Sequence, residues 1–153
     1  MKGKLVLIAA AIAASTALVA VPLTAASSID TKLQIGSSLH FPAPGSSAGT
    51  WVASGAVNDS GTVSSQATLT QLGDQDDGRL EGTAVFVGQQ GTFTIEFSGI
   101  GGPLTSPHRA ARGTFEIVSG TGAYAETRGH GTFLIIIDFT TGQSVRTDIG
   151  EIN

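Results

Sequence analysis

The chain has 153 residues, a formal net charge of −4 and no cysteine. This length fits one domain, and an acidic chain with eight Lys and Arg residues would repel a phosphate backbone, so we expect no nucleic-acid partner. The absence of cysteine excludes disulfides, thiol chemistry and thiolate-bound metals.

The first 26 residues have the composition of an export signal. Lys2 and Lys4 precede an apolar run over residues 5–21, and Pro22 and several small residues follow it. This order is typical of a secretory signal peptide, and an uncleaved membrane anchor is the alternative. We therefore expect residues 1–26 to be removed and the mature protein to be secreted, in a periplasm or outside the cell, with no membrane association after cleavage.

Residues 27–49 are rich in serine, proline and glycine. The sequence KLQIG (32–36) suggests a first strand, whereas HFPAPGSSAG (40–49) predicts a loop or linker because proline and glycine interrupt regular structure. We expect residues 27–49 to form an N-terminal segment that precedes a β-domain over residues 50–153.

From residue 50 onward, short runs of β-branched and aromatic residues alternate with glycine, aspartate, asparagine and serine, as in antiparallel strands and turns. No stretch has useful helical periodicity, and each interior glycine would cost a helix about 1 kcal/mol relative to alanine. The predicted strands are 51–57, 63–72, 79–87, 91–99, 112–119, 131–139 and 144–152. Seven or eight such strands form a sandwich or a closed barrel.

Alternation within the strands separates a buried face from a solvent face. In residues 91–99 the side chains of Phe93, Ile95 and Phe97 share one side of the strand, and Glu96 lies on the other. Glu116 is predicted to face solvent in the same way. The residues expected to line the lumen and contact an apolar ligand are Phe86, Phe93, Phe97, Phe115 and Phe133.

Strand 131–139 is apolar on both faces. Leu134 and Ile136 lie opposite Phe133, Ile135 and Ile137, and a strand that is apolar on both sides is usually covered on both. We expect a homo-oligomer, dimer or trimer, with this strand in its interface. The rival is that residues 27–49 fold back over the strand within one chain.

The stretch SGTGAYAETRGHGTF (119–133) contains four glycines. The third glycine of a dinucleotide-binding motif is missing, and a strand follows where a phosphate-binding helix would begin. A Walker lysine and a G-x-S-x-G nucleophile elbow are also missing. The stretch therefore predicts a structural corner between two strands, with Tyr124 closing a barrel end and its hydroxyl toward water.

This corner also resembles a known family signature. The sequence FEIVSGTGAYAETRGHGTF (115–133) is similar to the dirigent and allene oxide cyclase barrel superfamily, in which a strand enters a G-T/S-G-x-F/Y corner and leaves through A-R-G or L-R-G. The matching positions are Gly120, Thr121, Gly122, Tyr124, Arg128 and Gly129. The chain is most similar to small exported bacterial members of unassigned function.

The resemblance implies an all-β fold, a single eight-stranded antiparallel β-barrel that is often oligomeric and holds an apolar cavity. Plant members close a ring on a fatty-acid epoxide or direct the radical coupling of phenols, and some bacterial relatives form rings in polyketides. The catalytic residues of those enzymes lie outside the shared corner, so the resemblance assigns no catalytic residue here.

Other candidate motifs are weak. The three histidines are widely spaced, and GDQDDG (73–78) lacks the glutamate that completes a calcium loop, so we expect a solvated turn, no metal and no cofactor. The sequence GPLTSPHRAAR (102–112) predicts a polar loop or lid.

Three functions remain open: a binding protein for a small apolar ligand, a cyclase or isomerase, and a structural extracellular protein without a ligand. An inward carboxylate beside a ligand-sized cavity would favour the enzyme.

Overall fold

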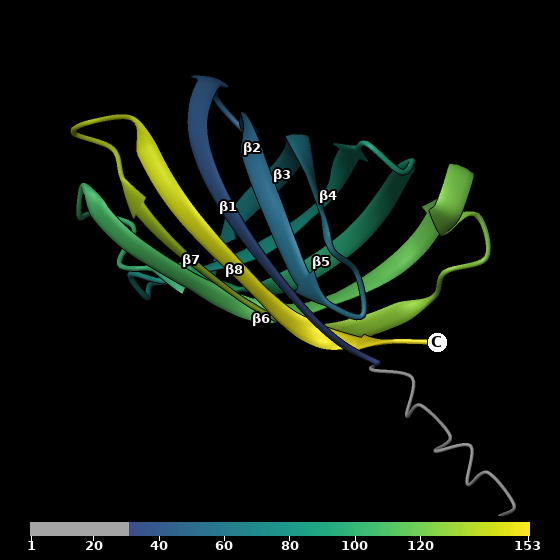
Figure 1. The fold of residues 1–153 in the computed structure, drawn as a ribbon. Coiled ribbons are helices and arrows are strands. Elements are labelled where there is room, and N and C mark those ends of the chain that lie inside the picture. The colour runs from purple at the N-terminus through teal and green to yellow at the C-terminus, as the bar shows by residue number, and fades with distance from the viewer. Residues whose placement is uncertain (1–30) are drawn as a thin grey trace, which may run out of the picture.

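The computed structural model describes residues 31–153, which form a closed eight-stranded barrel (Figure 1). The predicted signal peptide lies outside the described residues. The elements are β1 (Lys32–Ala43), β2 (Ser46–Gly55), β3 (Asp59–Gln71), β4 (Gly78–Gly88), β5 (Thr92–Gly102), β6 (His108–Gly120), η1 (Gly122–Tyr124), β7 (Gly129–Asp138) and β8 (Gln143–Ile152). Over residues 31–153 no helix has the length and apolarity needed to cross a bilayer. The predicted all-β antiparallel barrel is thus confirmed.

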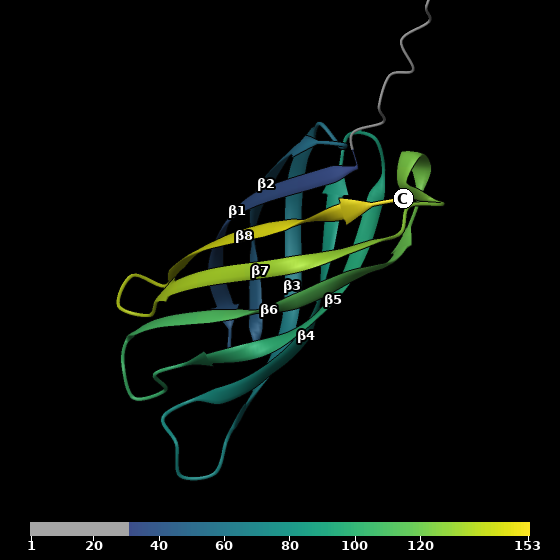
Figure 2. The same cartoon turned by 90° about the horizontal axis from the view of Figure 1, so that it is seen from below.

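The barrel has two unlike ends. Each strand pairs antiparallel with the next, and β8 pairs with β1 to complete the ring. One end, called the closed end here, carries the start of β1, the short 3-10 helix η1 and the end of β8. The other, called the open end, carries the turns and loops that join β1 to β2, β3 to β4, β5 to β6 and β7 to β8 (Figure 2).

Alternate residues of every strand point into the barrel, as the sequence pattern predicts. Buried aromatic and aliphatic side chains from all the strands except β8 form one core. Several inward positions are glycine, and at one of them the missing side chain leaves space for a large ring on the neighbouring strand. A Cβ atom on Gly82 would lie 2.7 Å from Cζ of Phe97, so glycine makes room for the aromatic ring.

Residues 40–49 were predicted as a loop, and this prediction is wrong. The strand β1 continues to Ala43 and β2 begins at Ser46, so a turn at Pro44 and Gly45 suffices, with Gly45 at a φ of +75°. The barrel therefore begins at Lys32 rather than at residue 50. Its apolar alternation was hidden because Ser37 occupies an inward, buried position.

Residues 102–112 were predicted as one loop, and most of them are also strand. The strand β5 ends at Gly102 and β6 begins at His108, which leaves 103–107 as the connection. The start of β6 has few large apolar side chains: its buried residue here is the small Ala111. Small inward residues carry too weak a signal for a strand to be recognised.

The apolar outer face of β7 is uncovered in the single chain. Leu134 and Ile136 point outward with exposed fractions of 47% and 53%. The rival covering segment does not lie over them, because residues 32–49 are part of the barrel wall. The part of that segment before residue 31 lies outside the described residues.

Candidate functional site

Aromatic rings fill the closed half of the lumen. The rings of Phe86 and Phe93 stack at 4.7 Å between centroids, and the indole of Trp51 meets both edge-on at 5.6 and 5.5 Å. The indole N–H of Trp51 donates to the carbonyl oxygen of Val87 at 3.3 Å. These contacts leave a residual cavity of about 10 Å³ near Tyr124, which is too small to bind a ligand.

Tyr124 closes this end, as predicted, but its hydroxyl does not face water. The side chain is buried, its ring meets Phe93 edge-on at 5.2 Å, and its hydroxyl donates to Oδ2 of Asp59 at 2.6 Å. This partner was not predictable from the sequence, because Asp59 lies 65 positions earlier in a region with the composition of a turn.

The Asp59 carboxylate is bound from several sides. Backbone N–H groups of Ser60, Gln89 and Gln90 donate to it in addition to Tyr124. The hydrogen bond from Tyr124, followed by those from the backbone, lowers the pKa of Asp59 to about 2. Burial, together with the hydrogen bond and negative charge of Asp59, raises the pKa of Tyr124 above its usual range. The cavity that borders Tyr124 has a volume of about 10 Å³, too small to admit a substrate, so we interpret this contact as a structural clasp.

The remaining residues of the corner motif also shape the backbone of the corner, and none of them borders the cavity near Tyr124. Gly122 has a φ of +61°, which favours glycine, and a Cβ atom on Gly120 would lie 2.1 Å from the carbonyl oxygen of Tyr124. A Cβ atom on Gly129 would be 2.5 Å from the carbonyl oxygen of Glu151. Arg128 is exposed, and its guanidinium donates to the carbonyl of Thr127.

The open half of the lumen contains a pocket of about 410 Å³. Aliphatic and aromatic side chains dominate its wall, with small polar residues between them. The lining residues include Leu39, Phe41, Ala67, Leu80, Phe97, Ile137, Phe139, Ser144 and Arg146. Eight-stranded barrels are wide enough to be filled by their own side chains or to hold one small ligand, and this lumen does each in one half.

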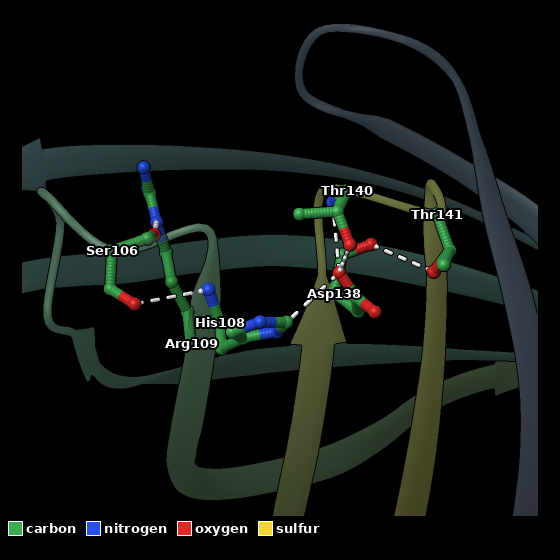
Figure 3. Close-up of polar contacts among 6 residues, drawn as sticks. All are labelled: Ser106, His108, Arg109, Asp138, Thr140 and Thr141. Carbon is green, nitrogen blue, oxygen red and sulfur yellow. Dashed lines mark hydrogen bonds and ion pairs between the residues drawn. The ribbon is translucent and has the colours of Figure 1, made fainter.

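Polar contacts hold the rim of the pocket in place. Asp138 accepts hydrogen bonds from the backbone and side chain of Thr140, and His108 approaches the same carboxylate at 3.5 Å (Figure 3). Arg109 donates to the carbonyl of Ser106 and stacks over the ring of Phe139 at 4.7 Å.

The ring of Phe139 connects the two sides of the rim. Phe139 in turn stacks on Phe41 of β1 at 5.4 Å between centroids. The mouth is therefore bounded by an ordered row of side chains that runs from the β5–β6 loop to β1.

A buried ion pair lies at the floor of the pocket, where Arg146 is the member that borders it. Arg146 and Asp148 of β8 both point inward, with exposed fractions of 2% and 0%. Nε of Arg146 donates to both carboxylate oxygens at 2.9 Å, and Nη2 donates to Oδ1 at 2.7 Å. The guanidinium lies between the rings of Phe97 and Phe133, at 4.5 and 4.8 Å from their centroids, so aromatic faces and a carboxylate compensate its charge.

The two charged groups differ in access to the pocket. Arg146 contributes to the pocket wall, whereas Asp148 lies behind it and does not. Burial raises the pKa of Asp148, and the charge and hydrogen bonds of Arg146 oppose that rise. Within residues 31–153, the hydrogen bonds of the Arg146 side chain are all made by Nε and Nη2, and Nη1 makes none.

Two buried serine hydroxyls lack partners. Both residues are buried, with an exposed fraction of 4% each. Even so, Oγ of Ser37 and Oγ of Ser144 form no hydrogen bond within the described part of the chain. Ser144 borders the pocket, whereas Ser37 does not. A second pair of hydroxyls, on Ser47 and Ser65, is satisfied internally at 2.6 Å. An unpaired buried hydroxyl costs about 1–3 kcal/mol, so Ser144 needs an explanation.

The five phenylalanines expected to line the lumen all face inward, but the structure separates them. Phe97 borders the pocket and Phe133 packs on Arg146, whereas Phe86 and Phe93 belong to the closed half. Phe115 is buried and does not border the pocket.

Sequence reasoning missed the charged floor. In SVRTDIGEI (144–152) the apolar Val145 and Ile149 occupy alternate positions, which suggests that they face inward, yet they are 59% and 58% exposed. Arg146 and Asp148, which lie between them, face the lumen instead. The pairing of Arg146 with Asp148 at an i, i+2 spacing was the available signal, since both side chains lie on one face of a strand.

A wide depression of about 490 Å³ also lies on the outer face of β4, β5 and β6, where Glu81, Glu96 and Glu116 border it. The predicted outward orientation of Glu96 and Glu116 is confirmed. Within residues 31–153, no group of three or more His, Asp or Glu residues is placed to hold a metal ion.

Comparison with protein-family models, curated proteins and solved structures found no match.

Proposed function

We propose that this protein binds one small, largely apolar molecule in the open half of its barrel. The observation that carries the proposal is the contrast within a single lumen, where one half is filled by rings in contact and the other holds a pocket of about 410 Å³. Ligand pockets in proteins commonly combine an apolar wall with a few placed polar groups, and Arg146 and Ser144 are such groups here.

Filling the pocket should abolish binding without disturbing the fold. Ala67 is a partly buried residue of β3 that borders the pocket, and its neighbour Thr68 is exposed on the outer face. The Ala67→Phe variant places a ring in the lumen, and Thr68→Phe adds the same ring outside. We expect the parent and Thr68→Phe to bind the fluorescent probe N-phenyl-1-naphthylamine, and Ala67→Phe to lose most of this binding.

Native mass spectrometry of the protein, followed by organic extraction, would identify a ligand retained during purification. Equal probe binding by all three proteins would place the binding outside the lumen and would contradict the proposal. A parent that binds neither the probe nor any extractable molecule would support the alternative, a structural extracellular protein without a ligand.

A second candidate function is a cyclase or isomerase of the allene oxide cyclase or dirigent type. One observation favours it, namely that the lumen is not lined by hydrocarbon alone but contains an inward carboxylate and guanidinium. Asp148 lies behind Arg146, however, and does not border the pocket. A proton-transferring group must come within hydrogen-bonding reach of its substrate, so this arrangement supports binding better than acid–base catalysis.

Export and family membership accompany this proposal. We propose that residues 1–26 direct the chain out of the cell and that the barrel is related to the allene oxide cyclase-like superfamily. The closed eight-stranded topology and the positions of Gly120, Gly122 and Tyr124 at the corner support the family proposal. Mass spectrometry of the mature N-terminus after expression with the full leader would test the export proposal.

A further inference from the structure

The floor of the pocket presents two hydrogen-bond donors with no acceptor from residues 31–153. These donors are Nη1 of Arg146 and the hydroxyl of Ser144, and both residues border the pocket. They occupy positions i and i+2 of β8, so their side chains emerge on the same face of the strand. The Ser144 hydroxyl is buried without a partner, and because buried polar groups nearly always have one, it calls for an explanation.

The charge balance of the floor indicates what kind of acceptor fits. Arg146 already forms three hydrogen-bond contacts with Asp148. When both groups are ionised, the positive charge of the guanidinium balances the negative charge of the carboxylate, so the pair has no net charge. An anionic ligand group would bring an uncompensated negative charge next to a carboxylate that is fully buried. Burying an unpaired charge is far more costly than burying a neutral polar group that forms hydrogen bonds.

We propose that the ligand carries a neutral oxygen acceptor, such as a ketone or ester carbonyl, that is held at the pocket floor by Arg146 and Ser144. A carbonyl oxygen has two lone pairs and can accept from both donors. The apolar remainder of the ligand lies against Leu39, Leu80 and Ile137. Asp148 and the rings on either side of the guanidinium keep Arg146 in place, so Asp148 is a positioning residue. This inference rests on the proposed function, since it names the chemical class of the ligand.

Three compounds of closely similar shape separate the possible ligand chemistries. Butylbenzene offers only hydrocarbon, butyrophenone adds a carbonyl, and 4-phenylbutanoate adds a carboxylate. Their dissociation constants can be measured by competition with N-phenyl-1-naphthylamine. Because the compounds differ in their transfer from water, each is compared between protein variants rather than with the other compounds.

The informative variant is Ser144→Ala, because it removes a hydroxyl that bonds to no described residue. The matched control is Ser37→Ala, which removes the other unpartnered buried hydroxyl, on a residue that pairs with Arg146 but does not border the pocket. We expect Ser144→Ala to weaken butyrophenone binding by roughly two- to tenfold, the typical effect of one hydrogen bond. Butylbenzene binding should be unchanged in Ser144→Ala, and binding of both compounds should be unchanged in Ser37→Ala.

A spectroscopic measurement tests the role of Arg146 without removing a buried charge. The infrared carbonyl band of butyrophenone labelled with 13C at the carbonyl should shift to lower frequency on binding, because hydrogen bonds weaken the C=O bond. In Ser144→Ala the shift should be smaller but still present, since Nη1 of Arg146 remains.

The outcomes distinguish the two levels of the proposal. If the parent binds butylbenzene but Ser144→Ala weakens butyrophenone no more than the hydrocarbon, the neutral-acceptor inference is wrong and the apolar pocket stands. An unshifted carbonyl band leads to the same conclusion. If 4-phenylbutanoate shows the larger loss in Ser144→Ala, the ligand group is anionic, and the neutral class is overturned. If the parent binds none of the compounds, the proposed function itself fails.

Discussion

The closed and open halves of this barrel are formed by the same eight strands but treat the interior in opposite ways. At the closed end, Trp51, Phe86 and Phe93 are in direct ring contact, and a residual space of about 10 Å³ remains nearby. At the open end, inward side chains surround about 410 Å³. We infer that the packed half provides most of the stability of the fold, which leaves the other half free to keep an unfilled pocket.

The two halves also treat a carboxylate differently. Asp59 at the closed end accepts hydrogen bonds from Tyr124 and three backbone N–H groups, which lower its pKa to about 2. Asp148 at the pocket floor is fully buried, and burial raises its pKa despite the contact with Arg146. One acid is stabilised by many local donors, whereas the other depends on a single guanidinium. Stability at the two ends should therefore respond oppositely to pH.

The largest expected effect is on the packed half. Phe86 is fully buried and contacts both Trp51 and Phe93. Phe86→Ala should lower the free energy of unfolding by about 3–5 kcal/mol, because it opens a cavity that rigid neighbours cannot fill. The matched change at the open end is Phe139→Ala. Because Phe139 is 46% exposed, this change should lower the free energy of unfolding by about 1 kcal/mol or less.

Urea unfolding at neutral pH measures both changes. A cost for Phe139→Ala that equals the cost for Phe86→Ala would mean that the open end contributes to stability as much as the closed end, and the comparison would then be wrong.

The second prediction concerns the ion pair. Arg146→Met removes the guanidinium and leaves Asp148 buried without its partner, which should cost about 3 kcal/mol or more at neutral pH. The double variant Arg146→Met with Asp148→Leu should be far less destabilised, because no buried charge is left uncompensated. Urea midpoints of the two variants provide the measurement.

The pH dependence identifies the cause of that loss. The raised pKa of Asp148 means that the folded state binds the proton more tightly than the unfolded state, so its contribution to stability falls as pH rises through the folded pKa. Without Arg146 this pKa rises further, and the single variant should regain stability as pH is lowered, whereas the double variant should not. A single variant with the pH response of the double variant would contradict this explanation.

The third prediction tests the Tyr124–Asp59 clasp. Because the pKa of Asp59 falls from 3.8 to about 2 on folding, its contribution to stability is present above about pH 4 and is lost as pH falls toward 2. Tyr124→Phe removes the hydrogen bond that contributes most to the lowered pKa. The variant should therefore be less stable at pH 7 but lose less stability than the parent on acidification.

Thermal unfolding of the parent and Tyr124→Phe at pH 7 and pH 3 provides the comparison. An equal difference between the two proteins at both pH values would show that the hydroxyl does not act through the ionised Asp59.

The fold was predictable because most strands keep large apolar residues on one face. Alternation in residues 91–99 and 112–119 placed Phe93, Phe97 and Phe115 inward, and the structure confirms this orientation. The predicted first strand ended too early for a physical reason. Ser37 is a polar residue at a buried position, and the strand residues on either side of the Pro44–Gly45 turn have the composition of a linker.

The candidate site was harder to predict than the fold. Its floor consists of polar residues of β8, while the apolar residues of that strand face outward, opposite to the usual pattern. A single sequence contains the periodicity of a strand but not the choice between its two faces when both carry plausible core residues. The hydrogen bond of Asp59 with Tyr124 depends on barrel closure, which brings together residues 65 positions apart.

The smallest effect on folding is expected from the outer wall, where we propose that the homo-oligomer forms. Leu134 and Ile136 of β7 are about half exposed, and they adjoin Val145 on β8, which pairs with Ile136. A second copy of the chain is the occupant we propose, since contiguous exposed apolar side chains commonly mark a contact surface. The double variant Leu134→Thr with Ile136→Thr should dissociate the oligomer while changing the unfolding free energy of the monomer by about 1 kcal/mol or less.

The matched control replaces exposed residues on another part of the wall. Val85 and Val87 of β4 also point outward, and their replacement by threonine should leave the assembly intact. Light scattering at high micromolar concentration gives the molar mass of each protein. A monomeric parent contradicts the oligomer, and a parent oligomer unaffected by the β7 substitutions contradicts this choice of interface. Because the outer wall and the lumen face opposite sides of the same strands, probe binding should survive dissociation, and its loss would show that the partner helps to form the pocket.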